Sequence, residues 1–93
     1  MLTLDATLDI PAYVTFTFLD QGAILLNTRT NHYFALDEVG ARLWGLLEKE
    51  KRLSVVYQVL LDEFEVEPTQ LEQDLLDLIN QLMEKGLVEI FQG

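Results

Sequence analysis

The chain has 93 residues and no cysteine, and its 16 acidic and 6 basic side chains give a formal net charge of −10. This length predicts a single domain over residues 1–93, and without cysteine no disulfide framework, thiolate metal site or cysteine nucleophile can form. No apolar run is long enough to span a membrane and no signal-peptide pattern opens the chain, so we expect a cytoplasmic protein. The acidity disfavours nucleic acid as a partner, because phosphate binding relies on Lys and Arg.

The first half of the chain predicts a small sheet. Apolar residues alternate through residues 1–12, which indicates an extended N-terminal arm. β-Branched and aromatic residues predict a strand over 13–19, and a turn at Gly22 leads into a second strand over 23–27. Residues 32–36 form a third predicted strand. The short polar connections between these strands predict an antiparallel meander.

The second half predicts three helices and a short final strand or tail over residues 87–90. Asp37 is placed to cap the first helix and Ser54 to cap the second. Pro68 suits the first position of the third helix, and Gly86 is placed to end it. Three short helices after a three-stranded antiparallel sheet predict an α+β domain of the winged-helix type.

No catalytic or metal-binding pattern emerges from the residue types and their spacing. The single histidine, His32, lies in a predicted strand, where a structural histidine is commoner than a ligand or a base. The glycines never cluster into a phosphate-binding loop. Asp74 and Asp77 lie on a polar helix face rather than in a cleft, where acid–base catalysis would need them. We therefore expect a protein that is not an enzyme, with no catalytic residue, no metal site and no cofactor.

The third predicted helix carries an apolar stripe about 160° wide, whereas packing against a small core needs about 100°. Its members are Leu71, Leu75, Leu76, Leu78, Ile79, Leu82 and Met83. Either the small domain wraps more of this helix, or one border of the stripe lines an exposed groove. The same helix carries Glu72, Asp74, Asp77 and Glu84 against one Lys85. It would therefore repel DNA, which a winged helix normally contacts through this element.

The predicted strand over 32–36 is an edge of the meander. Edge strands are usually protected by Lys, Pro or a bulge, and none of these lies within the segment. An unprotected edge beside an apolar helix border favours the addition of an extended peptide as a further strand.

Two parts of the sequence carry a family resemblance. The first is residues 24–27 with 32–44, which contain the pattern Tyr-Phe-x-Leu-x-Glu-Val-Gly-Ala-x-x-Trp, and the second is residues 64–68, 74–76 and 82–88. Together they make residues 13–90 resemble the PqqD-like family, the precursor-peptide recognition elements of ribosomally synthesised, post-translationally modified peptides. With 93 residues and no enzyme attached, the chain resembles the discrete members of that family.

The resemblance implies a winged helix-turn-helix domain without catalytic activity. In the family, the leader segment of a precursor peptide adds as a strand to the third strand, beside the third helix. The peptide-binding residues implied by motif position are His32, Tyr33, Phe34, Ala35 and Leu36 on the strand and Asp74, Leu75, Leu78, Ile79 and Leu82 on the helix. The acidic helix border would attract a leader rich in Lys.

The implied partners are a precursor peptide and a leader peptidase, a cyclase or another modifying enzyme, with no membrane and no nucleic acid involved. The stretch from Asn27 to Trp44 looks most like the lasso-peptide type, which we favour. Two alternatives stay open: a peptide chaperone in pyrroloquinoline quinone biosynthesis, and a generic winged-helix adaptor for protein interactions.

Overall fold

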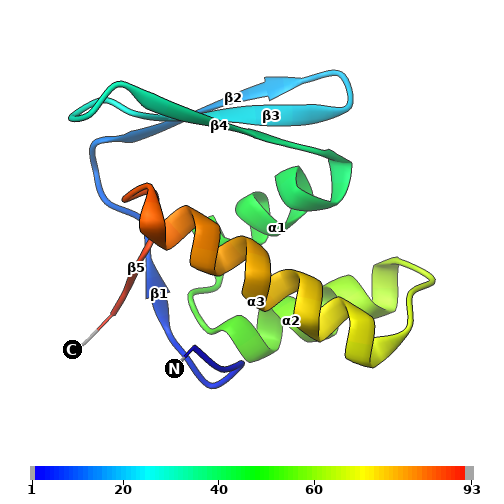
Figure 1. The fold of residues 1–93 in the computed structure, drawn as a ribbon. Coiled ribbons are helices and arrows are strands. Elements are labelled where there is room, and N and C mark those ends of the chain that lie inside the picture. The colour runs from blue at the N-terminus through cyan, green and yellow to red at the C-terminus, as the bar shows by residue number, and fades with distance from the viewer. Residues whose placement is uncertain (1, 92–93) are drawn as a thin grey trace.

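The computed structural model describes residues 2–91, so Met1 of the predicted arm and Gln92 and Gly93 lie outside the described residues. Its elements, in chain order, are β1 (Leu8–Asp9), β2 (Val14–Leu19), β3 (Gly22–Asn27), β4 (His32–Leu36), α1 (Glu38–Lys49), α2 (Leu53–Glu63), α3 (Pro68–Glu84) and β5 (Glu89–Ile90). The sheet of β2, β3 and β4 lies over α1, and α2 and α3 pack below α1 (Figure 1). This confirms the α+β architecture. No helix within the described range is long and apolar enough to cross a membrane.

The three-stranded sheet has β3 at its centre, with β2 and β4 antiparallel to it on either side, which confirms the predicted meander. Phe16, Leu25 and Phe34 occupy one row across the three strands. Side chains in one such row point to the same face of the sheet. That face covers α1, because Leu25 is fully buried and the Phe16 ring stacks on Trp44 with 6.5 Å between ring centroids.

The N-terminal arm is only partly extended. A hydrogen bond from the Ala6 N–H to the Thr3 carbonyl, 3.1 Å long, closes a turn near its start, so the prediction of an extended segment over residues 1–12 was wrong there. Beyond the turn, β1 pairs antiparallel with β5, which places these two segments side by side (Figure 1). Leu8 lies in the core, and its burial explains why the arm is held against the helices.

The helix ends follow local signals at α1 and α3. The Asp37 carboxylate caps α1 by accepting a 2.8 Å hydrogen bond from the Gly40 N–H, as predicted. Pro68 is the first residue of α3, and Gly86 follows its end with a φ of 70°, which glycine adopts without strain.

The predicted cap of α2 was wrong. The helix begins at Leu53, before Ser54, and its N-cap residue, Arg52, makes no side-chain capping bond. The Leu53 N–H donates instead to the Ala6 carbonyl at 3.0 Å. The arm therefore satisfies the first amide of α2, and a buried leucine starts the helix where a polar cap was expected.

One buried polar residue, Asn27, joins the sheet to α3. Its side chain is 2% exposed, and its Nδ2 donates to the carbonyls of Lys85 and Gly86 at 3.1 and 3.3 Å. Its Oδ1 accepts from the N–H groups of Arg29 and Thr30 at 3.0 and 3.3 Å. Asn27 thereby fixes both the turn before β4 and the position of the end of α3, which border the site described next.

Candidate peptide-binding site

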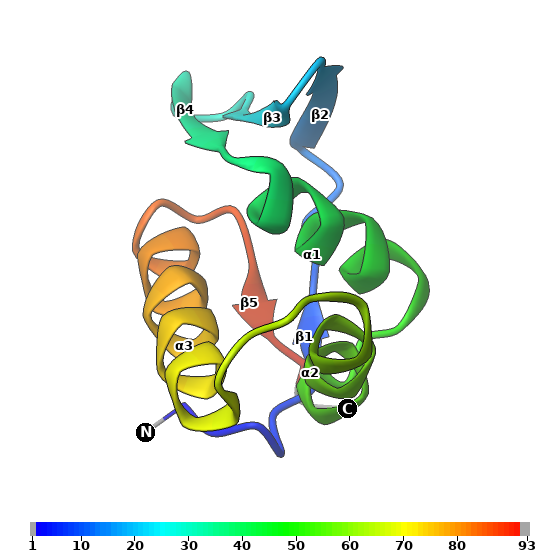
Figure 2. The same cartoon turned by 90° about the vertical axis from the view of Figure 1, so that its right-hand side faces the viewer.

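The free edge of the sheet that lies nearest α3 belongs to β4. Within the described part of the chain, β4 pairs only with β3, and their register runs from Ala23 opposite Leu36 to Asn27 opposite His32 without a bulge. In an antiparallel pair, alternate residues turn their N–H and C=O groups away from the partner. β4 and α3 lie on the same side of the molecule (Figure 2), so a strand added to this edge would run alongside α3.

An apolar hollow of about 400 Å³ opens beside the end of β4. We call it the Leu78 hollow. It is lined by Asp37, Val39, Gly40, Leu43, Leu60, Val66, Gln70, Leu71, Asp74, Leu75 and Leu78. Seven of these eleven residues are Val or Leu, so the hollow suits an aliphatic or aromatic side chain with polar groups only at its border.

Close packing holds the walls of the Leu78 hollow in place. A Cβ atom added to Gly40 would lie 3.1 Å from Leu36 Cδ2 and 3.3 Å from Asp37 Oδ1, so the first turn of α1 sits tightly against the end of β4. On the opposite wall, Gln70 Nε2 donates to Asp74 Oδ1 at 2.8 Å. The carboxylates of Asp37 and Asp74 are therefore both held by hydrogen bonds within the protein.

A second hollow, of about 380 Å³, lies at the other end of β4. We call it the Lys85 hollow, and it is lined by Tyr13, Asn27, Arg29, Thr30, His32, Glu84, Lys85 and Gly86. The Arg29 guanidinium lies over the Tyr13 ring, 4.8 Å from its centroid, which holds the cation at the border of the hollow. The two hollows thus lie at opposite ends of the same edge strand.

The structure brings some of the implied helix residues to the groove and places others in the core. Asp74, Leu75 and Leu78 line the Leu78 hollow together. Ile79 and Leu82 have no exposed surface and pack inside the domain. The free protein therefore has no surface at Ile79 or Leu82 to offer to a peptide.

The five strand residues also divide between environments. His32 lines the Lys85 hollow. Phe34 is half-buried and Leu36 is buried, on the face that covers the helices. Tyr33, which is 70% exposed, and Ala35 point to the opposite face. All five keep their backbone on the free edge, which is the part that strand addition uses.

Sequence reasoning missed several wall residues. Val39 and Leu43 lie in α1, and Val66 lies in the loop between α2 and α3. The available signal was Val66 itself, an aliphatic residue between Glu65 and Glu67, which the structure leaves 43% exposed. Nothing in the local pattern placed that loop opposite the first turn of α1.

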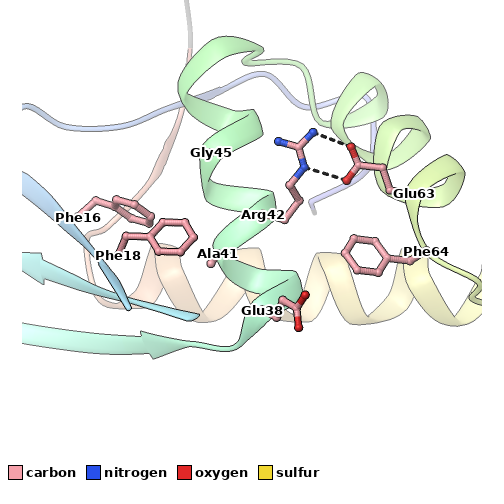
Figure 3. Close-up of a pocket in the computed structure, with 8 residues that line it drawn as sticks. All are labelled: Phe16, Phe18, Glu38, Ala41, Arg42, Gly45, Glu63 and Phe64. Atoms are coloured by element: carbon pink, nitrogen blue, oxygen red, sulfur yellow. Dashed lines mark hydrogen bonds and ion pairs between the residues drawn. The ribbon is translucent and has the colours of Figure 1, made fainter. Parts of the chain in front are cut away.

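A third hollow faces the other edge strand, β2. It has a volume of about 480 Å³ and is lined by Phe16, Phe18, Glu38, Ala41, Arg42, Gly45, Glu63 and Phe64 (Figure 3). Arg42 and Glu63 join α1 to α2 across it through two hydrogen bonds of 2.8 and 2.6 Å. The Arg42 hydrogen bond lowers the pKa of Glu63, and Glu63 raises the pKa of Arg42.

Within residues 2–91, no group of three or more His, Asp or Glu side chains is placed to hold a metal ion. The site consists of an edge strand that runs along α3, with a hollow at each end.

This arrangement is that of a known class of domains. The family model for coenzyme PQQ synthesis protein D (PqqD) matches residues 22–88, so the chain belongs to the PqqD family. No curated protein gives a significant match.

Two solved structures are similar to the whole fold. One is TbiB1 in complex with the TbiA(beta) leader peptide, with a TM-score of 0.82 and 34% identity, covering 91% of this chain and 99% of that one. The other is a lasso peptide synthetase B1 complexed with the leader peptide, with a TM-score of 0.71 and 28% identity, covering 90% of this chain and 99% of that one.

Proposed function

We propose that the chain binds the leader segment of a ribosomal precursor peptide, which adds as a strand to the free edge of β4 and places an apolar side chain in the Leu78 hollow. The observation that carries the proposal is that hollow, which lies at the end of an unpaired edge strand. Both similar structures hold a leader peptide, and they cover nearly the whole chain. The binding is non-catalytic, and the chemistry is left to partner enzymes.

The energetics favour anchors over backbone pairing. Each added hydrogen bond contributes about 0.5–1.5 kcal/mol net, whereas ordering each peptide residue costs about 1–2 kcal/mol. Backbone pairing along five residues of β4 therefore roughly cancels the ordering cost. Each buried aliphatic or aromatic anchor adds about 1.5–3 kcal/mol, so the Leu78 hollow decides affinity and specificity.

Hydrogen exchange tests the docking edge. With the TbiA(beta) leader as the probe, we expect the amides of residues 32–36 to exchange more slowly in the presence of the peptide. The other edge strand, Val14–Leu19, is an internal control because it is equally unpaired on one side and lies away from α3. Protection confined to β2, or protection of neither strand at saturating peptide, contradicts the proposal.

A matched pair of substitutions tests the hollow. Leu78→Asp puts a carboxylate in the apolar wall, and we expect it to weaken peptide binding at least tenfold, which corresponds to about 1.4 kcal/mol. Leu76→Asp is the control, because Leu76 is also half-buried on α3 but lines none of the three hollows described. Circular dichroism establishes that both variants fold, and fluorescence polarisation measures affinity. If both variants fold and bind the peptide with equal affinity, the Leu78 hollow does not hold the peptide anchor.

We further propose that the bound leader is delivered to a leader peptidase and a cyclase of a lasso-peptide pathway, in the cytoplasm where ribosomal precursors arise. The two similar B1 structures support this choice. Adding the chain to a purified leader peptidase and its precursor should accelerate leader removal, and Leu78→Asp should reduce the acceleration. A peptidase rate that does not respond to the chain rules out delivery.

The family model favours a second candidate, a peptide chaperone in pyrroloquinoline quinone biosynthesis. The two candidates differ in their ligand. Tighter binding of a pyrroloquinoline quinone precursor than of a lasso leader, measured side by side, would replace the first candidate by the second. A generic adaptor would bind neither.

A further inference from the structure

The two ends of the β4 groove carry opposite charge. At the Leu36 end, Asp37 and Asp74 line the Leu78 hollow and no basic residue lines it, which gives a formal charge of −2. At the His32 end, the Lys85 hollow is lined by Arg29 and Lys85 against one acid, Glu84, which gives +1 with His32 neutral. The acidic surface expected along α3 from the sequence therefore stops before the end of the groove.

The charges at both ends are available to a ligand. The two salt bridges found among residues 2–91 join Arg42 to Glu63 and Arg52 to Glu50, so neither base of the Lys85 hollow is used in one. At the acidic end, the carboxylates of Asp37 and Asp74 accept hydrogen bonds only from uncharged groups of the protein. Charge complementarity can therefore act at each end.

We propose that the groove selects a peptide by the order of its charges: a basic residue beside the apolar anchor at the Leu36 end, and an acidic residue at the His32 end. The inference rests on the proposed function and specifies the ligand class for that site. The five residues of β4 span about 13 Å. The two charges of the ligand are therefore about four residue steps apart along an extended strand.

Strand pairing also determines which end of the peptide carries the basic residue and which end carries the acidic one. Antiparallel pairing is the more stable arrangement for an added strand, and β4 runs from His32 to Leu36. The N-terminal end of the ligand then lies at the Leu36 end of the groove. The selected pattern is Lys or Arg next to an aliphatic or aromatic residue, followed toward the C-terminus by Asp or Glu.

A display library of random peptides about twelve residues long, enough to span the groove with a margin at each end, tests the pattern. The library is selected in parallel on the wild-type chain and on the double variant Asp74→Lys with Lys85→Glu. The control is the double variant Glu72→Lys with Lys49→Glu, which exchanges the same charges at exposed positions that line neither hollow. Peptides from each selection are then measured individually, with hydrogen exchange of β4 as a second readout.

We expect the wild type and the control to enrich the stated charge order. The double variant leaves the Leu78 hollow with no net charge and gives the Lys85 hollow a charge of −1. It should therefore enrich peptides with a basic residue at the His32 end and with no charge preference at the Leu36 end. A peptide selected on the wild type should lose about two- to fivefold in affinity for each end whose charge is changed, a range typical of exposed ion pairs. Salt should weaken its binding. Peptides that protect β4 and share an apolar anchor without a charge order overturn this inference alone. Selected peptides that leave β4 unprotected, or no enrichment at all, overturn the proposed function with it.

Discussion

Replacing the single side chain of Asn27 should remove a large share of the stability of the fold, because that side chain makes four hydrogen bonds. Asn27→Ala removes all four of them, two to the carbonyls of Lys85 and Gly86 and two to the N–H groups of Arg29 and Thr30. The turn residues are exposed, so water replaces their bonds, whereas Asn27 itself is 2% exposed. At about 0.5–1.5 kcal/mol for each bond, the four bonds together contribute about 2–6 kcal/mol. Because water can replace the two bonds at the exposed turn, we expect the free energy of unfolding to fall by an amount near the lower end of this range, about 2–3 kcal/mol.

Such a loss is a substantial part of the roughly 5–15 kcal/mol that stabilises a domain, and it should lower Tm by at least about 8 °C. Thermal and urea unfolding followed by circular dichroism measure the change. Asn80→Ala, at an exposed position on α3, is the control and should change stability by less than about 0.5 kcal/mol.

A local measurement separates this explanation from a general loss of stability. Because Asn27 holds the end of α3 to the sheet, the Leu87 amide, which donates to the Leu82 carbonyl, should exchange disproportionately faster in Asn27→Ala. A variant as stable as the control, or one in which Leu87 exchange changes no more than that of the other core amides, refutes the reasoning.

Three further predictions concern two glycines and the Arg42–Glu63 pair. Gly86→Ala should destabilise the fold by at least about 1 kcal/mol, because φ is 70° and the new Cβ would lie 2.9 Å from Asn27 Nδ2. Gly45→Ala should stabilise it by up to about 1 kcal/mol, because that Cβ would meet nothing within 4 Å in a helix interior; urea unfolding checks both signs. Arg42 lowers the pKa of Glu63 below its ordinary 4.5 in the folded state only, so the unfolded chain takes up the proton first. The advantage of wild type over Glu63→Gln should therefore be complete above about pH 5 and disappear as the pH falls through the folded-state pKa. Unfolding measured near pH 7 and near pH 3 would contradict this if the difference stayed constant.

Local chemistry made most of the elements predictable. The β-branched and aromatic residues of β2, the Asp37 cap, Pro68 at the start of α3 and the positive φ of Gly86 all depend on residues close in the chain. The edge position of β4 also followed from the sequence, because short turns impose nearest-neighbour pairing in a meander. The helical period of the apolar residues also showed that the apolar stripe on α3 is wider than packing against a small core requires.

Contacts between distant segments decided the rest. The pairing of β1 with β5, and the use of Ala6 to satisfy the first amide of α2, join residues from opposite parts of the chain, and no local signal specifies them. The periodicity of α3 identified an apolar face but not its neighbours. For that reason it could not separate Leu78, at the border of a hollow, from Ile79 and Leu82 in the core.

The sequence by itself thus determined an acidic α+β domain with an unprotected edge strand beside an amphipathic helix. The tertiary structure alone decided where that edge meets apolar walls and how the charges are distributed along it. The physical reason is that strand and helix signals act over a few residues. The groove, in contrast, is made by α1, α2, α3 and a loop that meet only when the core, and the side chain of Asn27, bring them together.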